Sequence, residues 1–409
     1  MATRVRSYSK INLGLAIGPV RADGFHGLAT LYQTLALHDV VTVEVKPTSQ
    51  SRDVGHPDSS QTRISLTTNH PQVPADSRNT AWKMVELALA RMGVAAEVAI
   101  HIEKELPVQG GLGAGSANAA AALIGLEREL GFSLSELARM ELAAEVGSDV
   151  PLFLLGGAVL GTERGERVME MQDLPATWCV VAVPEIGVST PRAFQEWDSL
   201  CAAREKASPN AKCGGPSTPL RSGRDDGHEE EAASSELTSP AQPDRLEELS
   251  HVYASVFGAQ ASDTSGIVRS RQDSFSSETK QGGSEGIRFT SGQGSVRDDL
   301  AGNILLALVR TGIENDFEQV VFPQYPLLRE IKHELMGTSA DGLHEGRPDD
   351  LSGKALYAAL SGSGSALFGL YGCEQDARAA QQRVQASGCK ALLTETLPRA
   401  EYWRRMFAE

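Results

Sequence analysis

Two periodicities of apolar and polar residues run along the chain, and each predicts one kind of secondary structure. Apolar residues alternate with polar ones over 5–17, which is the period of a half-buried strand. An alanine-rich run over 117–130, interrupted only by Gly125, has the pattern of a helix. The same criteria predict further strands at 40–45, 98–102, 158–161, 179–183, 355–360, 366–370 and 391–396, and further helices at 80–92, 134–146, 303–311, 326–336 and 375–386. Helices and strands interleave without regular βαβ spacing, so we expect an α+β fold.

The composition changes sharply over 201–298, which is rich in Ser, Gly, Asp, Glu, Gln and Arg and poor in large aliphatic residues. Such a segment buries too little apolar surface to offset the entropy that is lost on ordering. We therefore expect a disordered insertion, with one short helix near 243–256, and a smaller excursion of similar composition at 337–353. A chain of 409 residues is also long enough to form two domains.

Charge and cysteine content argue against several classes of protein. The formal net charge of -15 disfavours a nucleic-acid-binding surface, because neutralising phosphates requires clustered Lys and Arg. The five cysteines have neither a CxxC pair nor metal-ligand spacing, so we expect no metal site and a reducing compartment. The charged N-terminus is unlike a signal peptide, and no run of about 18 apolar residues is present to span a membrane. These features predict a soluble, cytoplasmic protein without a membrane partner.

The strongest local signal is a glycine-rich loop directly before the alanine-rich helix. Its four glycines let backbone N–H groups approach an anion, and the helix N-terminus adds free donors and a favourable dipole. The Ser116 hydroxyl at the end of the loop can bond a phosphate or reach a metal ion. The loop is neither a Walker A sequence nor GxGxxG, and taken alone it could also be a flexible turn. The residues expected at this anion site are Pro107, Gly110, Gly111, Leu112, Gly113, Ala114, Gly115, Ser116 and Ala117.

Three further segments have polar residues in positions suited to chemistry. Lys10 and Asn12 share one face of the first predicted strand. Asp149 follows a predicted helix and precedes an apolar stretch at 150–153 that we expect to be a strand. A second glycine-serine run, at 360–368, joins two predicted strands. Each segment alone is ordinary, because an isolated strand lysine or helix-terminal aspartate is more often a solvated charge than a catalyst.

The order of these segments resembles the GHMP kinase superfamily, which includes galactokinase, homoserine kinase and mevalonate kinase. Lys-Ile-Asn-Leu comes first and is followed by PxxxGLGAGSA, GSDVP and LSGSGSALF. The resemblance implies a two-domain fold with the active site in the cleft between the domains, ATP as co-substrate, and Mg²⁺. It also implies an ATP-binding domain over 1–170 and a second domain made of 171–200 and 299–409, with the insertion at 201–298 outside both.

Within the superfamily, the chain is most similar to a branch that phosphorylates an alcohol bearing a cytidine diphosphate, on the non-mevalonate route to isoprenoids. The closer match lies in Arg21-Ala-Asp-Gly-Phe-His26 and in Leu-Tyr-Gln-Thr at 31–34. Lys10 and Asp149 match the family's catalytic pair. The aspartate would take or orient the proton of the acceptor hydroxyl, while the lysine cation stabilises negative charge beside it. Transfer of the γ-phosphate would then depend mainly on positioning and charge neutralisation.

The same resemblance implies four substrate-binding residues. Phe25 and Phe194 match aromatic residues that stack on the cytosine, and His26 matches the residue that reads the edge of the base. Asn12 would bond the alcohol moiety. Two positions depart from the family pattern, because Phe25 stands where Tyr is common and Ala117 where loops often have a second Ser. Both changes remove a hydroxyl but keep the aromatic face and the loop's backbone donors, so we expect activity to be retained.

Two other interpretations stay open. The chain could be another kinase of the superfamily, acting on homoserine, mevalonate or a sugar, although these substrates have no base for Phe194 to stack on. It could also be a nucleotide-binding regulator without catalytic activity, although the presence of both Lys10 and Asp149 argues against this class. The sequence does not distinguish a monomer from a homodimer.

Overall fold

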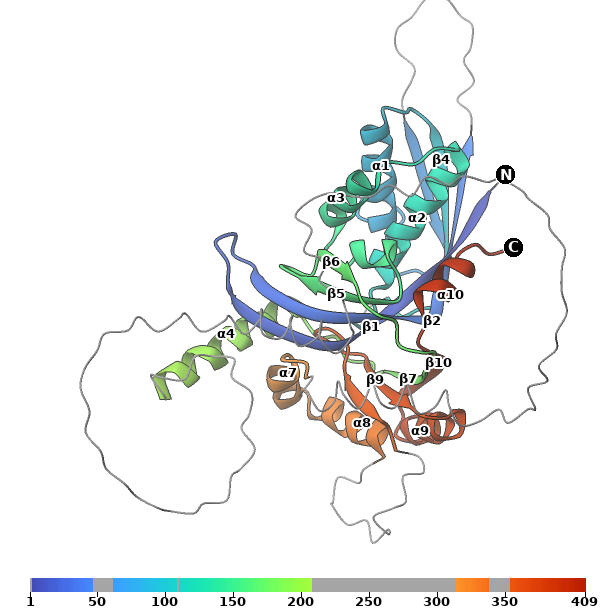
Figure 1. Ribbon diagram of the computed structural model, residues 1–409. Helices are drawn as coiled ribbons and strands as arrows, with labels where there is room; N and C mark the ends of the chain where they lie inside the picture. The colour runs from blue at the N-terminus through green and yellow to red at the C-terminus, as the bar shows by residue number, and fades with distance from the viewer. Residues whose placement is uncertain (1, 47–61, 109, 208–313, 338–353) are drawn as a thin grey trace, which may run out of the picture.

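The computed structural model describes residues 2–46, 62–108, 110–207, 314–337 and 354–409. In this part of the chain there are two separate sheets: the first contains a long curved hairpin, the second packs against that hairpin, and each has helices beside it (Figure 1). Within the same residues, no helix is both long and apolar enough to cross a lipid bilayer. The mixture of sheets and helices confirms the predicted α+β class.

The first sheet is built on the long antiparallel hairpin of β1 (Thr3–Val20) and β2 (His26–Lys46). Along the sheet the strand order is β3-β4-β2-β5-β6, and β1 pairs with β2 beside this path. The other strands are β3 (Arg63–Thr68), β4 (Glu97–Glu103), β5 (Ala158–Thr162) and β6 (Arg167–Glu170). Both hairpin strands have a continuously buried central stretch, because one part of the hairpin packs under helices and another part against the second sheet.

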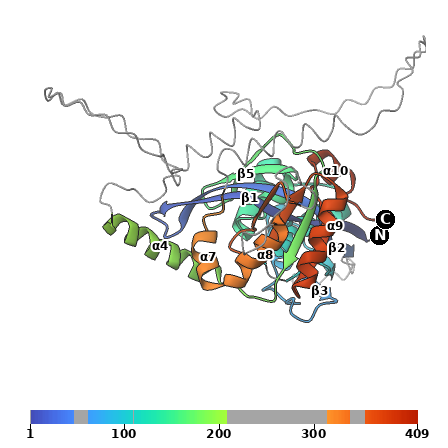
Figure 2. The same ribbon diagram turned by 90° about the horizontal axis from the view of Figure 1, so that it is seen from below.

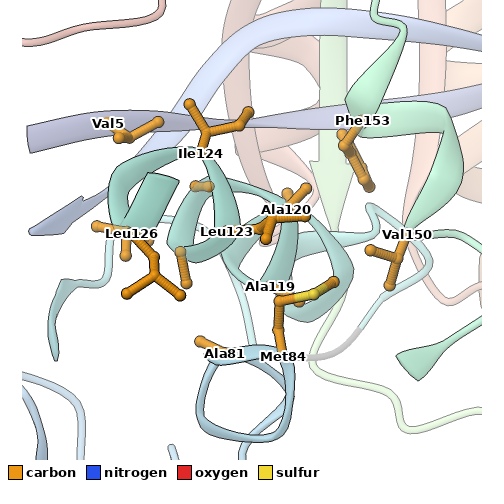
Figure 3. Close-up of a cluster of buried hydrophobic side chains, with 14 of the residues drawn as sticks. Val5, Ala81, Met84, Ala119, Ala120, Leu123, Ile124, Leu126, Val150 and Phe153 are labelled. Atoms are coloured by element: carbon orange, nitrogen blue, oxygen red, sulfur yellow. The ribbon is translucent and has the colours of Figure 1, made fainter. Parts of the chain in front are cut away.

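Helix α2 (Ala114–Leu130) is the centre of the larger core, between strand β1 and helix α1 (Thr80–Met92), as Figure 3 shows. Its alanines allow this close packing, and Gly125 explains the interruption in the alanine run. A Cβ on Gly125 would lie 2.8 Å from Cγ2 of Val43, so a larger residue would push the helix away from β2. Helix α3 (Glu136–Val146), capped by the Ser135 side chain, completes this layer.

The second sheet has the order β10-β7-β9-β8, and all of its pairs are antiparallel. Its strands are β7 (Trp178–Val183), β8 (Tyr357–Leu360), β9 (Leu367–Tyr371) and β10 (Lys390–Glu395). Helices α8 (Pro326–Met336) and α9 (Glu374–Ala386) lie beside this sheet (Figure 2), with α7 (Glu318–Gln324) leading into α8. Helix α8 buries Leu328, Ile331 and Leu335, which is the apolar stripe that its sequence predicts.

Contacts between residues far apart in the sequence join the two sheets. One buried cluster contains Ile11 and Leu31 of the hairpin together with Val181 and Phe368 of the second sheet. The chain then returns to the first sheet, where α10 (Arg399–Arg404) places the Tyr402 hydroxyl 2.6 Å from the carbonyl oxygen of Phe153, to which it donates. The hairpin and the second sheet therefore share one buried cluster.

Most predicted elements agree with the structure, and the helices predicted at 80–92 and 326–336 match residue for residue. The strand predicted at 150–153 is wrong, because Pro151–Leu154 forms a 3₁₀ helix, η1, whose first residue lacks the N–H that a strand ladder needs. The predicted insertion begins too early, since helix α4 (Thr190–Ala207) continues past residue 201. The helices predicted near 243–256 and at 303–311 lie outside the described residues.

Candidate active site

A lysine and an aspartate from distant parts of the chain meet at the centre of the hairpin. Lys10 Nζ lies 3.4 Å from Asp149 Oδ2 and donates a 2.6 Å hydrogen bond to Asn12 Oδ1. The Lys10 side chain is only 3% exposed, whereas that of Asp149 is 32% exposed. The cation is thus shielded from water while the carboxylate stays open to a small molecule, which is the arrangement that a base acting on a hydroxyl requires.

Irregularities in the backbone aim these side chains. The register of β1 on β2 shifts between Tyr8 and Lys10 and again between Asn12 and Gly14, and such bulges bend a strand and redirect its side chains. Asp149 lies in the short turn between α3 and η1. This turn follows Gly147, whose N–H closes the last turn of α3, so the aspartate projects from a helix end and not from a strand.

The glycine-rich loop lies directly over this pair. A Cβ on Gly113 would be 3.1 Å from Cγ of Lys10, and the Leu112 carbonyl oxygen accepts a 3.0 Å hydrogen bond from the Lys10 backbone N–H. Gly110, Gly111 and Gly113 all have positive φ, the left-handed region that favours glycine. The loop therefore has a backbone conformation that other residues adopt only with strain, and its backbone at Leu112 and Gly113 contacts Lys10.

Helix α2 begins at the end of this loop, and no side chain of a described residue caps its first turn. Gly113 is the N-cap residue, and its carbonyl oxygen accepts from the N–H of Ala117. The first N–H groups of the helix are the donors that an anion can use. Ser116 lies in this first turn, with its Oγ 4.0 Å from where a Cβ on Gly147 would be, which places it on the side facing Asp149.

The remaining members of the predicted loop have mainly packing roles in the structure. Leu112, Ala114 and Ala117 are buried in the described protein. Gly115 accepts a 2.6 Å hydrogen bond at its carbonyl oxygen from the Thr80 hydroxyl of α1. These contacts hold the loop between α1 and β1, so that its conformation is determined by both elements.

The second glycine-serine run meets the first. The Ser361 hydroxyl donates to the carbonyl oxygen of Gly111 at 2.9 Å, and the Ala366 N–H donates to that of Gly110 at 3.1 Å. A Cβ on Gly362 would lie 3.5 Å from Asn12 Oδ1 and 3.7 Å from Lys10 Nζ. The sequence motifs at both ends of the chain thus converge on the lysine.

A buried polar network supports the segment that enters the loop. Asp39 of β2, which is fully buried, pairs with the buried ammonium of Lys104 at 2.5 Å. Its other oxygen accepts from the backbone N–H groups of Glu105 and Leu106, both at 2.8 Å. Asn118 of α2 joins the network when its amide nitrogen faces Asp39, at 3.1 Å. The carboxylate therefore ties the segment before the loop to both the sheet and the helix that follows the loop.

At the far end of the hairpin, a second group of side chains forms an aromatic site. The rings of His26 and Phe194 are stacked, with centroids 4.7 Å apart and an interplanar angle of 13°. His26 Nε2 also lies 2.8 Å from Asp198 Oδ1. Phe194 and Asp198 both belong to helix α4. Phe25 is 56% exposed, and the guanidinium of Arg164 lies 5.3 Å from the centre of its ring. The structure thus brings His26, and not Phe25, against Phe194.

Sequence reasoning missed two residues of the site. Tyr32 of β2 donates its hydroxyl to Asp149 Oδ1 at 3.0 Å, and Asp198 contacts His26 as described above. Tyr32 lies within the Leu-Tyr-Gln-Thr motif but received no role, because nothing local indicates its distant partner. Asp198 is four residues after Phe194, a spacing that would place both on one helix face had helix α4 been predicted.

The donor set suits a magnesium–nucleotide complex better than a protein-only metal site. Over the ranges that the structure describes, no group of three or more His, Cys, Asp or Glu side chains is arranged to hold a metal ion. Mg²⁺ typically keeps several waters and binds one or two protein oxygens plus substrate phosphates. The Ser116 hydroxyl in the first turn of α2 matches this pattern.

Comparison with known proteins connects this geometry to a family of kinases. Residues 79–157, which include the glycine-rich loop and Asp149, match the model of the GHMP kinases N terminal domain. A 4-diphosphocytidyl-2-C-methyl-D-erythritol kinase of Nocardioides sp. is 41% identical over 196 residues, which are 48% of this chain and 63% of that relative. The chain thus spans less than two thirds of the length of this curated relative.

Two solved structures share the fold. A crystal structure of 4-(cytidine 5'-diphospho)-2C-methyl-D-erythritol kinase has a TM-score of 0.54 and 23% identity, covering 96% of this chain and 99% of that chain. A homoserine kinase from Cytophaga hutchinsonii has a TM-score of 0.55 and 15% identity, and the match covers 97% of this chain and 95% of that chain. These neighbours share the overall fold of this chain, and their similar scores show that the fold alone does not select a substrate.

Proposed function

We propose that this GHMP kinase homologue transfers the γ-phosphate of ATP to the 2-hydroxyl of 4-diphosphocytidyl-2-C-methyl-D-erythritol, a step in non-mevalonate isoprenoid precursor synthesis. The main support for a kinase is the Lys10–Asp149 pair, at 3.4 Å, directly beneath the glycine-rich loop. The choice of substrate follows from the sequence relatives, which are named as kinases of this compound. We assign the reaction to the cytoplasm, where ATP is available.

In this proposal the phosphates of ATP bind to the glycine-rich loop and the first turn of α2. The N–H groups of this region and the dipole of α2 stabilise negative charge on the transferring group. The Ser116 hydroxyl would hold Mg²⁺ together with the phosphates, and the ion would supply further charge neutralisation. The packing of Gly113 against Lys10 supports a phosphate site beside the proposed catalytic pair.

Asp149 then accepts or orients the proton of the acceptor hydroxyl. Its exposed edge faces the open side of the site, while buried Lys10 stabilises negative charge on the carboxylate and on the attacking oxygen. The Asn12 amide oxygen accepts a hydrogen bond from the Lys10 ammonium, and its amide nitrogen donates a 2.8 Å hydrogen bond to the Thr30 hydroxyl. These two bonds fix the amide beside the proposed acceptor position. The reaction then needs mainly alignment and charge neutralisation.

The cytidine end lies farther along the same strand. His26 and Tyr32 are six residues apart on β2, which corresponds to about 20 Å of extended strand, and their side chains point to the same face. A molecule that reaches from His26 to Tyr32 needs a base, a spacer and a reacting hydroxyl. Homoserine has neither a base nor a spacer. The base would stack on Phe194 by taking the place of the His26 ring, with Phe25 as the second aromatic residue.

We further propose the domain division expected from the sequence, 1–170 and 171–200 with 299–409. Strands β1 to β6 all belong to the first sheet and β7 to β10 to the second, which supports a boundary between β6 and β7. The last residues return to the first sheet through the hydrogen bond from Tyr402 to Phe153.

The proposed function is tested with the purified chain, ATP, Mg²⁺ and a panel of alcohols. We expect phosphorylation of the cytidine diphosphate alcohol and no turnover of homoserine, mevalonate or galactose. Asp149→Asn should bind ATP normally and lose turnover by about 10²–10⁴-fold, the typical contribution of a positioned base. Glu141→Gln, an isosteric change on the exposed face of α3, should have wild-type turnover. Preference for another alcohol would refute the substrate, and near-normal turnover of Asp149→Asn would refute the role of the base.

A further inference from the structure

We propose that Tyr32 is a positioning residue that holds the carboxylate of Asp149 in its reactive orientation. The inference rests on the proposed function, since it assumes that Asp149 acts on the substrate hydroxyl. It assigns a role to a residue that touches neither ATP nor the acceptor in the mechanism above, and it depends on the geometry of three side chains.

The two oxygens of Asp149 have different partners. Oδ1 accepts a 3.0 Å hydrogen bond from the Tyr32 hydroxyl, and Oδ2 lies 3.4 Å from Lys10 Nζ. A carboxylate held at only one oxygen can rotate about its Cβ–Cγ bond, and a side chain that is 32% exposed has room to do so. The second contact prevents this rotation, so the pair of partners fixes the plane of the carboxylate.

Tyr32 is itself held firmly enough to act as a fixed point. Its side chain is 2% exposed, and it lies on β2 opposite Val159 of β5, two residues before Gly161. A Cβ on Gly161 would be 2.6 Å from Cε2 of the ring, and one on Gly165 would be 2.6 Å from its hydroxyl oxygen. The two glycines therefore leave a slot that fits the ring and its hydroxyl, and a tyrosine in this slot cannot swing away from Asp149.

The hydroxyl of Tyr32 is protonated at neutral pH and can donate a hydrogen bond. Burial, followed by the negative charge of Asp149 and a smaller effect of Glu166, raises the pKa of Tyr32 well above its usual value of 10.0. The charged groups that face this hydroxyl are Asp149 and Glu166, and the Lys10 ammonium lies 5.5 Å from the centre of the ring. Tyr32 therefore stays protonated and supplies a neutral donor beside a charged acceptor.

The test compares Tyr32→Phe with wild type, both alone and in the Asp149→Asn background. Loss of a hydrogen bond to a charged group predicts a fall in kcat of about 10- to 100-fold, with the KM for ATP and for the alcohol within about twofold of wild type. In the Asp149→Asn background, Tyr32→Phe should change turnover little, because its effect acts through the carboxylate. Tyr371→Phe is the matched control, because that hydroxyl donates to the Leu335 carbonyl oxygen in the second sheet and should leave kcat unchanged.

The inference and the proposed function fail in different ways. If the wild-type protein does not phosphorylate the cytidine diphosphate alcohol, the proposed function is refuted. The inference can still be tested by comparing kcat of Tyr32→Phe with that of wild type on any alcohol that the protein does phosphorylate. A double-mutant cycle in urea unfolding needs no activity, and we expect the midpoint shifts of Tyr32→Phe and Asp149→Asn to be non-additive. Two outcomes would overturn the positioning role. One is additive shifts of the urea midpoint, and the other is an equal loss of kcat from Tyr32→Phe in the wild-type and the Asp149→Asn backgrounds.

Discussion

The contact between the two glycine-containing segments can be tested with a single methyl group. Gly111 has a φ of +79°, and a Cβ at this position would lie 2.1 Å from the carbonyl oxygen of Ser361. Favourable contacts between heavy atoms need about 3.5 Å, so Gly111→Ala must separate the two segments by more than about 1 Å. The left-handed conformation adds a backbone strain of about 1–3 kcal/mol for a residue with a side chain.

The matched control is Gly131→Ala at the C-terminus of α2. Gly131 has nearly the same φ, +73°, but nothing lies within 4 Å of the added methyl group. Gly131→Ala therefore includes the backbone strain without the steric clash. The difference between the two variants isolates the effect of separating the glycine-rich loop from the second glycine-serine run.

We expect Gly131→Ala to lower the free energy of unfolding by about 1–2 kcal/mol and to keep wild-type kcat/KM. Gly111→Ala should be destabilised further and should lose about 10²-fold in kcat/KM for ATP, because a shift of about 1 Å misaligns the phosphate donors. Urea unfolding and steady-state kinetics at varied ATP measure the two effects. Equal behaviour of the two variants in both assays would refute the contact and its role in placing the phosphates.

Two further predictions concern buried charges. Asp39→Asn breaks the buried pair with Lys104 and should lower the free energy of unfolding by about 3–5 kcal/mol in urea titrations, whereas Glu103→Gln, in a half-exposed pair, should change it by less than about 1 kcal/mol. Similar losses in both variants would contradict the burial of Asp39. Burial raises the pKa of Glu127 despite the nearby Arg139, so its contribution to stability is present at low pH and is lost as pH rises through the raised pKa. The free energy of unfolding of Glu127→Gln, taken relative to that of wild type, should therefore be higher at pH 8 than at pH 5. A difference between the two proteins that does not change with pH would refute this reasoning.

Much of the local structure follows from short-range patterns. The apolar spacing over Thr80–Met92 and the alanine run of α2 predicted their helices, since helix formation depends on neighbours three and four residues apart. Errors arose where a single residue or a long-range contact overrides the pattern. Pro151 turns an apolar stretch into a 3₁₀ helix. Strand β2 begins at His26, well before the strand predicted at 40–45, because it pairs with β1 along the hairpin.

The chemistry divides in the same way. The sequence by itself indicated the anion-binding loop, because glycine content and the helix that follows it are local properties. The resemblance to a kinase family implied Lys10 and Asp149 as partners. Only the tertiary structure decided that Tyr32 donates to Asp149, that Asp39 braces the loop, and that His26 stacks on Phe194. Each of these contacts joins residues far apart in the chain. Their distances depend on how the strands and helices pack, which no local pattern of residues specifies.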